Sequence, residues 1–305
     1  MREDRPVRET ITAGGLRHSV LVWEGDPALT VVAVHGYLDC GGSFGAMVRR
    51  LPPGLRIVAP DMRGHGDSER ISRGAYYHFF DYVRDLRDLV DAFVPARMAL
   101  LGHSMGGGIA SLFAGTWPGD VERLILVEGL GPPQERAEDG PARMARWVDE
   151  VRKVDPTRVK SFPSRADVAK RLRRSNPRLS EPLGDELAGL LAVEQPDGSW
   201  RWKHDPLHRT RTPALYDWGR YRPFAEAIAC PTLLVTGGKS WYRYRSLEER
   251  RTSLGDARRL HLEEAGHMVH HDAPDELAEA IVAFLAGGEP AGSGPVPAEA
   301  SPSSP

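Results

Sequence analysis

The sequence has little cysteine, no long apolar run and almost no net charge. Its 305 residues include two cysteines, Cys40 and Cys230, and two cysteines do not make a disulfide framework. No apolar stretch approaches the roughly 18 residues that indicate a membrane span. The first six residues lack the apolar core of a secretory signal. We therefore expect a cytoplasmic protein without a membrane partner.

The charge balance excludes another class of partner. The formal net charge is -2, from 40 basic and 42 acidic residues, so no overall field attracts nucleic acid or an anionic membrane. The short basic run at residues 170–174 is typical of a solvated helix face. Of the 40 basic residues 35 are arginine, and the chain has 32 glycines and 25 prolines, a bias that favours a GC-rich bacterial genome. We expect a monomer or homodimer.

Alternation of apolar strands with amphipathic segments dominates the rest of the chain. Short apolar runs predict strands at Leu16–Trp23, 30–34, 56–60, 97–101, 121–128, 231–236 and Ala257–Leu262. Segments with helical spacing predict helices at 44–51, Phe79–Phe93, 107–114, 246–254 and 274–286. This order predicts an α/β fold with a doubly wound, mostly parallel sheet that is covered on both faces.

The alternation is interrupted once. Residues 132–224 contain amphipathic segments at 143–154 and 166–174 and no strong strand, which predicts a helical insertion. The expected organisation is a core at 1–131, the insertion at 132–224, the remaining core at 225–286 and a disordered Gly-, Pro- and Ser-rich tail at 287–305.

One pentapeptide carries most of the chemistry. Gly-His-Ser-Met-Gly at residues 102–106 stands between an apolar run and a run of small residues. Strand, G-x-S-x-G and helix make a nucleophile elbow, in which a tight turn presents a serine hydroxyl above a sheet. Outside this context the pattern is only a glycine-rich turn. Here it makes Ser104 the candidate nucleophile.

A serine nucleophile needs a base and donors for an oxyanion. His267 follows the last predicted strand and precedes the last predicted helix, which is the place for the base. The nearby pair His267 and His271 has the spacing of a metal site but lacks a third ligand, so we expect no metal and no cofactor. The expected oxyanion donors are the amides of Met105, after the nucleophile, and Tyr37, after an early strand.

The orienting acid is harder to place. The segment after the strand at 231–236 has no carboxylate before Glu248, whereas Glu128 directly follows the strand one earlier. A carboxylate at a strand end is otherwise hard to explain, so we assign Glu128 to this role, with an ion-paired hinge residue as the alternative. Further candidates are too close in sequence to His267 for easy geometry: Glu263, Glu264 and Asp272.

These residues together resemble the α/β-hydrolase superfamily. The resemblance rests on His35-Gly36, Asp-Met-Arg-Gly-His-Gly-Asp-Ser at 61–68, the elbow and Gly266-His267, and it covers about residues 16–131 and 225–286. The residues around 35–44 are similar to those of serine hydrolase-like proteins. The resemblance implies a sheet of about eight strands with a cap after the sixth. Some haloalkane dehalogenases share a glutamate after the sixth strand, but Ser104 and Met105 replace their aspartate nucleophile and tryptophan.

Aromatic residues suggest where substrate binds. We expect a pocket lined by His103, Leu38, Trp218, Trp241 and Tyr242, with Tyr244 nearby. The alternative is that these aromatics pack the insertion on the core.

The residues predict a serine hydrolase that cleaves a small to medium carboxylic ester through an acyl-enzyme, with a small-molecule acyl substrate. Thioesters, lactones and carbon–carbon bonds next to a ketone suit the same residues. The second hypothesis is a ligand-binding or signalling protein on a hydrolase scaffold, since no carboxylate follows the seventh strand.

Overall fold

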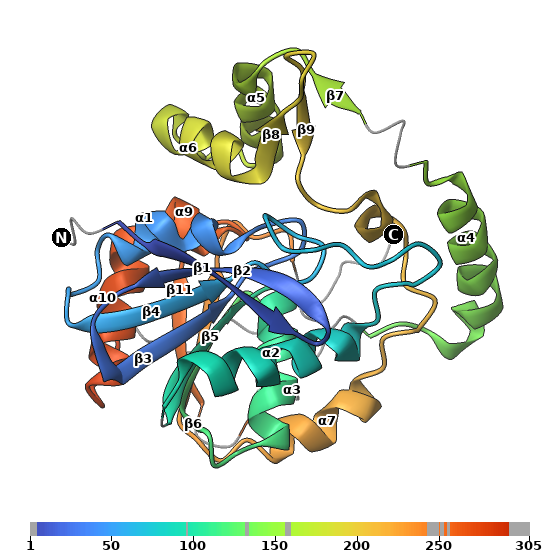
Figure 1. The fold of residues 1–305 in the computed structure, drawn as a ribbon. Helices are drawn as coiled ribbons and strands as arrows, with labels where there is room; N and C mark the ends of the chain where they lie inside the picture. The colour runs from blue at the N-terminus through green and yellow to red at the C-terminus, as the bar shows by residue number, and fades with distance from the viewer. Residues whose placement is uncertain are drawn as a thin grey trace, which may run out of the picture.

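The centre of the molecule is an eight-stranded sheet with the order β1-β2-β4-β3-β5-β6-β10-β11 (Figure 1). The computed structural model describes residues 5–95, 97–131, 134–155, 160–242, 250, 253–254 and 257–292. The strands are β1 (Val7–Ala13), β2 (Leu16–Trp23), β3 (Asp26–Val34), β4 (Leu55–Pro60), β5 (Met98–His103), β6 (Val121–Val127), β10 (Thr232–Gly237) and β11 (Ala257–Leu262).

Strands β1, β2 and β4 pair antiparallel at one edge, and every pair from β4 to β11 is parallel. Parallel strands need crossover connections, which the helices between them supply. The predicted fold class, a mostly parallel sheet of about eight strands, is therefore confirmed. The carboxyl ends of the central strands meet at one edge of this sheet, where open α/β sheets bind ligands.

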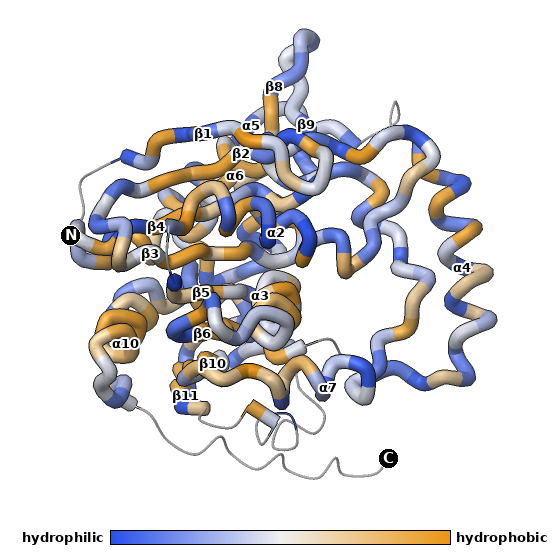
Figure 2. The backbone as a smooth tube through the Cα atoms, turned by 60° about the horizontal axis from the view of Figure 1, so that its bottom comes forward, coloured by the Kyte–Doolittle hydropathy of each residue, from blue (hydrophilic) through white to orange (hydrophobic). Residues whose placement is uncertain are grey.

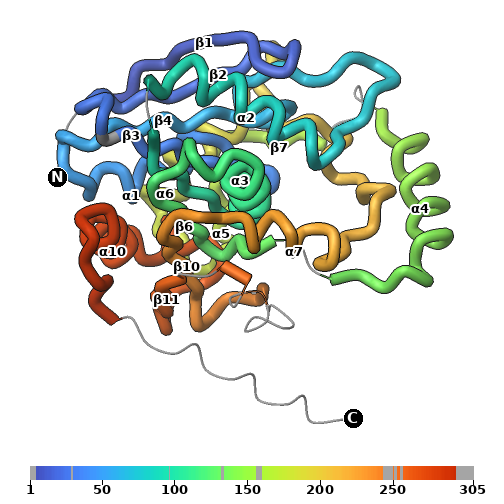
Figure 3. The backbone as a smooth tube through the Cα atoms, turned by 90° about the horizontal axis from the view of Figure 1, so that it is seen from below, coloured from blue at the N-terminus to red at the C-terminus, as the bar shows by residue number. Residues whose placement is uncertain are grey.

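Side-chain alternation within β3 shows why both faces are covered. Val32 and Val34 join one apolar cluster, and Val31 and Ala33 join another on the opposite face. The first cluster is covered by α2 (Phe79–Phe93), α3 (Met105–Thr116) and α7 (Trp218–Glu226), and the second by η1 (Gly41–Phe44), α1 (Gly45–Val48), α9 (Val269–Asp272) and α10 (Pro274–Leu285). Figures 1 and 3 show α2, α3 and α7 gathered together and α10 apart from them.

The inserted segment is less purely helical than expected. It contains α4 (Gly140–Lys153), α5 (Arg165–Ser175) and α6 (Glu181–Leu191), but β7 (Ser161–Phe162), β9 (Trp200–Trp202) and β8 (Ala192–Glu194) form a small antiparallel sheet. The sequence predicts no strong strand here, and the structure adds three short strands to the predicted helices. These strands are two or three residues long, which is too short for an alternating apolar pattern to appear in the sequence.

Two helices mark the limits of the inserted segment. The helix α4 buries none of its residues, stands away from the sheet in Figure 1 and alternates apolar and polar residues in Figure 2. The helix α7 instead packs on α3 as part of the core layer, with Trp218, Tyr221 and Ala225 buried. The two short turns η2 (Ala137–Asp139) and η3 (Pro206–Arg209) complete the segment. The division at 132–224 stays a prediction.

Some expectations cannot be compared with the structure. Most of the predicted helix at 246–254, and the tail beyond residue 292, lie outside the described residues. Within the described part of the chain, no helix is long and apolar enough to cross a membrane.

Candidate active site

The nucleophile elbow forms where β5 passes into α3. Ser104 has φ +50° and ψ −113°, a conformation that a non-glycine residue adopts only when its surroundings enforce it. The enforcement is visible at the flanking glycines. A Cβ on Gly102 would lie 2.3 Å from the carbonyl oxygen of Gly106, and a Cβ on Gly106 would lie 2.1 Å from that of Val34. The chain therefore needs glycine at both places to bring strand and helix this close.

Three predicted catalytic residues form a continuous hydrogen-bonded chain. The Nε2 atom of His267 lies 2.9 Å from the Oγ atom of Ser104, and its Nδ1 atom lies 3.0 Å from Oε2 of Glu128. These residues come from the ends of β5, β6 and the loop after β11, which the sheet order brings to one edge. The arrangement is that of a nucleophile, a base and an orienting acid.

Glu128 is held by the strand that follows the insertion. Its Oε1 atom accepts a hydrogen bond from the Gly237 amide at 2.8 Å, and Oε2 accepts one from the Ser240 hydroxyl at 2.5 Å. The side chain is 2% exposed, and the backbone has φ +51°. A buried carboxyl group that makes three hydrogen bonds, including that with His267, is satisfied and held in one orientation.

Ser240 is a contact that sequence reasoning missed. It stands in the segment after β10, where a carboxylate is usual and none is present. Its hydroxyl reaches a carboxylate 112 residues away in the chain. The one available signal is its position after β10, the seventh strand of the eight-stranded sheet, but a serine there does not reveal its partner.

The other acidic candidates have different contacts. Glu263 is exposed and lies 3.3 Å from His261, and Glu264 lies 3.6 Å from the Lys239 ammonium. Asp272 accepts from the Gly266 amide at 2.8 Å, so it supports the loop that carries His267 without touching the imidazole. Glu248 lies outside the described residues.

Two backbone amides are available beside Ser104. The amides of Tyr37 and Met105 have no hydrogen-bond partner among the described residues. Met105 is the first residue of α3, where amides lack an intrahelical acceptor and the helix dipole favours negative charge. Both amides are thus free to donate to an oxyanion on a substrate. Leu38, the neighbour of Tyr37, has φ +60°, which places a third strained residue at this site.

A group of buried imidazoles surrounds the base. The Nε2 atom of His103 donates to the carbonyl oxygen of His267 at 2.9 Å, and the ring stacks edge-on against His270 at 4.5 Å. Burial, with the neighbouring imidazoles, lowers the pKa of His103 well below its usual value and that of His270 to about 3. These rings stay neutral at pH 7 and add no repulsion when His267 becomes protonated.

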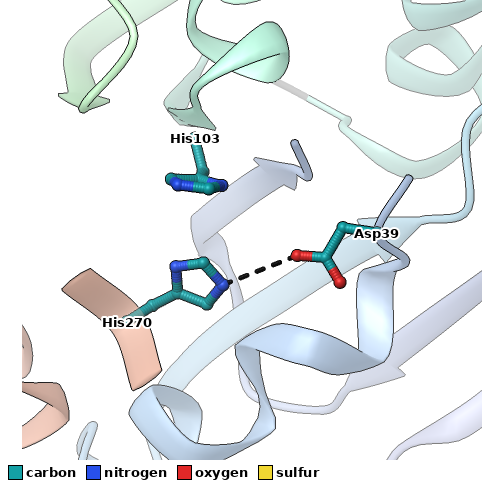
Figure 4. A group of neighbouring side chains, drawn as sticks. All are labelled: Asp39, His103 and His270. Carbon is teal, nitrogen blue, oxygen red and sulfur yellow. Dashed lines mark ion pairs between the residues drawn. The ribbon is translucent and has the colours of Figure 1, made fainter. Parts of the chain in front are cut away.

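Figure 4 shows a group among the described residues whose side chains could in principle bind a metal ion. Asp39, His103 and His270 have ligand atoms within 4.8 Å of one another, and all three side chains are buried. The Nε2 atom of His270 faces the Asp39 carboxylate at 3.7 Å and lies 3.0 Å from the Ser43 hydroxyl. Ser43 also donates to Asp39 at 2.7 Å, so protein hydrogen bonds already join these groups. The absence of a metal site stays a prediction.

Two cavities open beside Ser104, with volumes of about 400 and 410 Å³. Tyr242 lines the first, and His103, Leu38 and Trp241 line the second. Trp241 and Tyr242 both pack against His267, with ring centroids 4.9 and 5.5 Å from its imidazole and 5.7 Å from each other. Tyr244 lies outside the described residues.

The expectation for Trp218 is wrong. This side chain is 7% exposed and lines neither cavity beside Ser104. It packs in the core layer under the Arg250 guanidinium, 4.7 Å from the ring. The physical reason is that α7 belongs to the core, so its aromatic face is used for packing. The structure brings Tyr216 of the same sequence cluster to the first cavity.

Comparison with known proteins places this site in a family. The sequence profile of the alpha/beta hydrolase fold matches residues 30–274, and the chain belongs to this family. It is similar to a serine hydrolase-like protein of Danio rerio, with 32% identity over 187 residues, 60% of this chain and 57% of that protein. The matched part thus spans little more than half of that relative.

Solved structures give the same class. The fold is similar to that of a thioesterase domain from the curacin biosynthetic pathway, with a TM-score of 0.80, 28% identity and coverage of 92% of this chain and 99% of that one. An esterase of Mycobacterium tuberculosis shares the fold alone, at 20% identity and a TM-score of 0.73, with 94% of each chain covered. The chain is therefore a hydrolase-family protein with serine hydrolase-like relatives.

Proposed function

We propose that the protein is a serine hydrolase that cleaves a small to medium carboxylic ester. Ser104 is the nucleophile, His267 the general base and Glu128 the orienting acid, with the Tyr37 and Met105 amides as oxyanion donors. The observation that carries the proposal is the continuous hydrogen-bonded chain from the Ser104 hydroxyl through His267 to Glu128. The inserted segment acts as a cap, since its residues line both cavities beside Ser104.

The geometry supports a two-step reaction. Ser104 Oγ attacks the ester carbonyl carbon while its proton passes to Nε2 of His267, and the carbonyl oxygen becomes an anion between the two amides. Each well-placed oxyanion donor stabilises such a transition state by about 2.7–4 kcal/mol. The intermediate collapses when His267 protonates the departing alkoxide, which leaves an acyl-enzyme. Water then attacks with His267 again as base, which releases the acid and restores Ser104.

This mechanism uses protein groups alone and needs neither metal nor cofactor. Glu128 stabilises the imidazolium and holds Nδ1 as the protonated nitrogen, so that Nε2 faces the nucleophile. A thioester is the nearest alternative substrate, supported by the similarity to a thioesterase domain. A lactone or a carbon–carbon bond next to a ketone requires the same groups.

The receptor hypothesis rested on the missing carboxylate after β10. Glu128 occupies that position in space, because its carboxylate bonds to Gly237 and Ser240 from that very segment. A binding protein has no need of an oriented acid on a base next to a serine. This contact favours turnover over binding alone.

The test is a panel of p-nitrophenyl esters with labelling by a fluorophosphonate. The intact protein should hydrolyse at least one short ester and take up the label, and Ser104→Ala should lose both. The Ser104→Ala protein should keep the melting temperature within a few degrees, since only one hydroxyl is removed. Labelling or hydrolysis that survives in Ser104→Ala would overturn the assignment. Tight product binding without turnover by the intact protein would support the receptor hypothesis.

A further inference from the structure

Two cavities of similar size meet at the Ser104 hydroxyl. Ser104, Tyr37 and Arg209 line both, so the serine stands at a junction. The first, called here the tyrosine cavity, is walled by aromatic side chains: Tyr76, Tyr77, Phe79, Tyr82, Tyr216 and Tyr242. The second, called here the leucine cavity, is walled by Leu172, Leu179, Leu187, Leu191 and Trp202 of the inserted segment. An ester has two substituents, and the site has two spaces for them.

The position of His267 decides which substituent enters which cavity. In the proposed reaction His267 must give its proton to the leaving oxygen, so the leaving group has to lie on the side of the imidazole. His267 lines the leucine cavity together with Met268 and Trp241, and the described lining of the tyrosine cavity does not include it. The elbow residue Met105, whose amide faces the oxyanion, lines the tyrosine cavity instead.

Resting on the serine hydrolase function proposed above, we propose that substrate lies across Ser104 with its acyl group in the tyrosine cavity and its leaving group in the leucine cavity. The departing alcohol then vacates the space beside His267. The water for the second step enters the same space, where His267 can take its proton. One cavity thus serves the leaving group and the hydrolytic water in turn.

The walls of the tyrosine cavity specify the acyl group. Most of its tyrosine hydroxyls bond to the protein, among them Tyr76 to Thr210 at 2.7 Å and Tyr77 to Asp205 at 2.9 Å. The tyrosine and phenylalanine side chains therefore offer the cavity mainly the surface of their rings, which favours flat or aromatic groups. Three arginines also line this cavity: Glu135 forms an ion pair with Arg143, Glu150 forms one with Arg211, and Arg209 donates to His204 at the junction of the two cavities. An uncharged aromatic acyl group therefore fits, and about 400 Å³ accommodates one or two fused rings.

Polar side chains such as Arg171 and Asn176 also line the leucine cavity, and its aliphatic part favours an apolar leaving group. Leu187 and Leu191 of α6 are 2% and 9% exposed, and they form a cluster with Leu179. An alkyl alcohol would exchange water for this aliphatic wall at about 0.8 kcal/mol per buried methylene. The substrate class is thus an aromatic carboxylic ester of an alkyl alcohol.

Kinetic measurements can separate the roles of the tyrosine cavity and the leucine cavity. An acyl-enzyme has already lost its leaving group, so the ratio of deacylation rates for two acyl groups reports on the tyrosine cavity, because the water in the leucine cavity is the same for both. We would measure deacylation of benzoyl and naphthoyl enzymes by burst kinetics, and the ratio of kcat/KM for octyl and methyl benzoate. Two variants each enlarge one cavity: Phe79→Ala enlarges the tyrosine cavity and Leu191→Ala the leucine cavity. The control is Val193→Ala, whose exposed side chain lines neither cavity.

Phe79→Ala should change the naphthoyl-to-benzoyl deacylation ratio by about tenfold and leave the octyl-to-methyl ratio within twofold. Leu191→Ala should change the octyl-to-methyl ratio by a similar factor and leave the naphthoyl-to-benzoyl deacylation ratio within twofold. Val193→Ala should change neither ratio. If Phe79→Ala or Leu191→Ala fails to fold, Phe79→Leu and Leu191→Val should change the same two ratios by smaller factors.

The reverse pattern, in which Leu191→Ala alters the naphthoyl-to-benzoyl deacylation ratio and Phe79→Ala the octyl-to-methyl ratio, would overturn the assignment of the cavities. Equal effects of each variant on both ratios would also overturn it. In both cases a burst with acylated Ser104 leaves the proposed function intact. Hydrolysis without any acylated Ser104 would instead overturn the proposed function itself.

Discussion

At the scale of single residues, backbone strain is concentrated where the chemistry is proposed. Among the described residues, the non-glycine residues with positive φ are Leu38, Ser104 and Glu128, and each belongs to the candidate site. Such conformations cost about 1–3 kcal/mol each and persist only where the surroundings enforce them. The turns that carry the nucleophile, the acid and the oxyanion loop are thus held rigidly by the core.

The two hydrogen bonds to Glu128 Oε2 give a graded prediction. In Glu128→Gln the side-chain amide can donate to Nδ1 of His267, which favours the wrong tautomer and should lower kcat by roughly 10³- to 10⁴-fold. Ser240→Ala removes one donor to the carboxylate but leaves the charge and its contact with His267. A hydrogen bond to a charged group contributes about 1.5–3 kcal/mol, so a fall in kcat of about tenfold or more is expected.

Steady-state kinetics with one p-nitrophenyl ester would measure both effects, and thermal melting would show whether each variant is folded. An unchanged kcat in folded Glu128→Gln would remove Glu128 from the proposed catalytic group. A larger loss in Ser240→Ala than in Glu128→Gln would show that the hydroxyl does more than position the acid.

The sequence identifies those functional residues whose role follows from a local pattern of neighbouring residues. Ser104 is marked by its flanking glycines, and His267 by its place after the last strand. Ser240 and Trp218 are different, because their roles depend on partners far away in the chain, Glu128 and the packing surface under α7. A hydroxyl or an indole has the same sequence signal whether it lies in a site or in a core.

At the scale of elements, the close approach of β5, α3 and β3 defines the elbow. The Gly106→Ala variant would place a Cβ 2.1 Å from the Val34 carbonyl oxygen, and the atoms it meets are backbone atoms of Val34 and His35, which cannot move aside as a flexible side chain can. Overpacking of this kind typically costs about 1–3 kcal/mol, which corresponds to several degrees of melting temperature in a protein of this size. We expect loss of activity together with this destabilisation.

The matched control is Gly119→Ala, because nothing lies within 4 Å of a Cβ at Gly119. Its melting temperature should stay close to that of the intact protein, as for most surface substitutions. Equal melting temperatures for the two variants, measured by calorimetry, would refute the steric account of the elbow.

Elements were predictable in proportion to their length and periodicity. The central parallel strands are continuous apolar runs, and α2 has a clear apolar stripe, so their places follow from the sequence. The inserted segment shows the limit. Its strands β7, β8 and β9 gain stability by pairing with one another rather than from their own pattern, and no two- or three-residue signal predicts such pairing.

At the scale of the whole molecule, several histidines are buried without charge. Burial lowers the pKa of His208 and His270 to about 3 and that of His204 to about 4, below the value of about 6.5 in an unfolded chain. The unfolded state therefore binds more protons below pH 6.5, so acid favours unfolding. Stability should be retained above pH 6.5 and fall as the pH drops toward 4. Each such histidine adds a slope of about 1.4 kcal/mol per pH unit.

Denaturant unfolding at several pH values between 6.5 and 4.5 would measure this slope. His208→Gln should reduce the slope of the free energy of unfolding against pH by the contribution of one buried histidine. His78→Gln, at an exposed position, should leave the slope unchanged. An identical slope in His208→Gln and the intact protein would show that His208 is not buried in its neutral form.

The overall architecture links these scales to one central claim, that an acyl group is transferred to Ser104. The sheet order gathers three strand ends at one edge, and the inserted segment lines two cavities over it. The most direct measurement is acid quenching of a reaction with p-nitrophenyl benzoate, followed by peptide mass spectrometry. The account predicts a benzoyl adduct on the peptide that contains Ser104, at the Ser104 hydroxyl, and no adduct in Ser104→Ala. Ester hydrolysis with the adduct on another residue, or with Ser104→Ala as active as the intact protein, would contradict it.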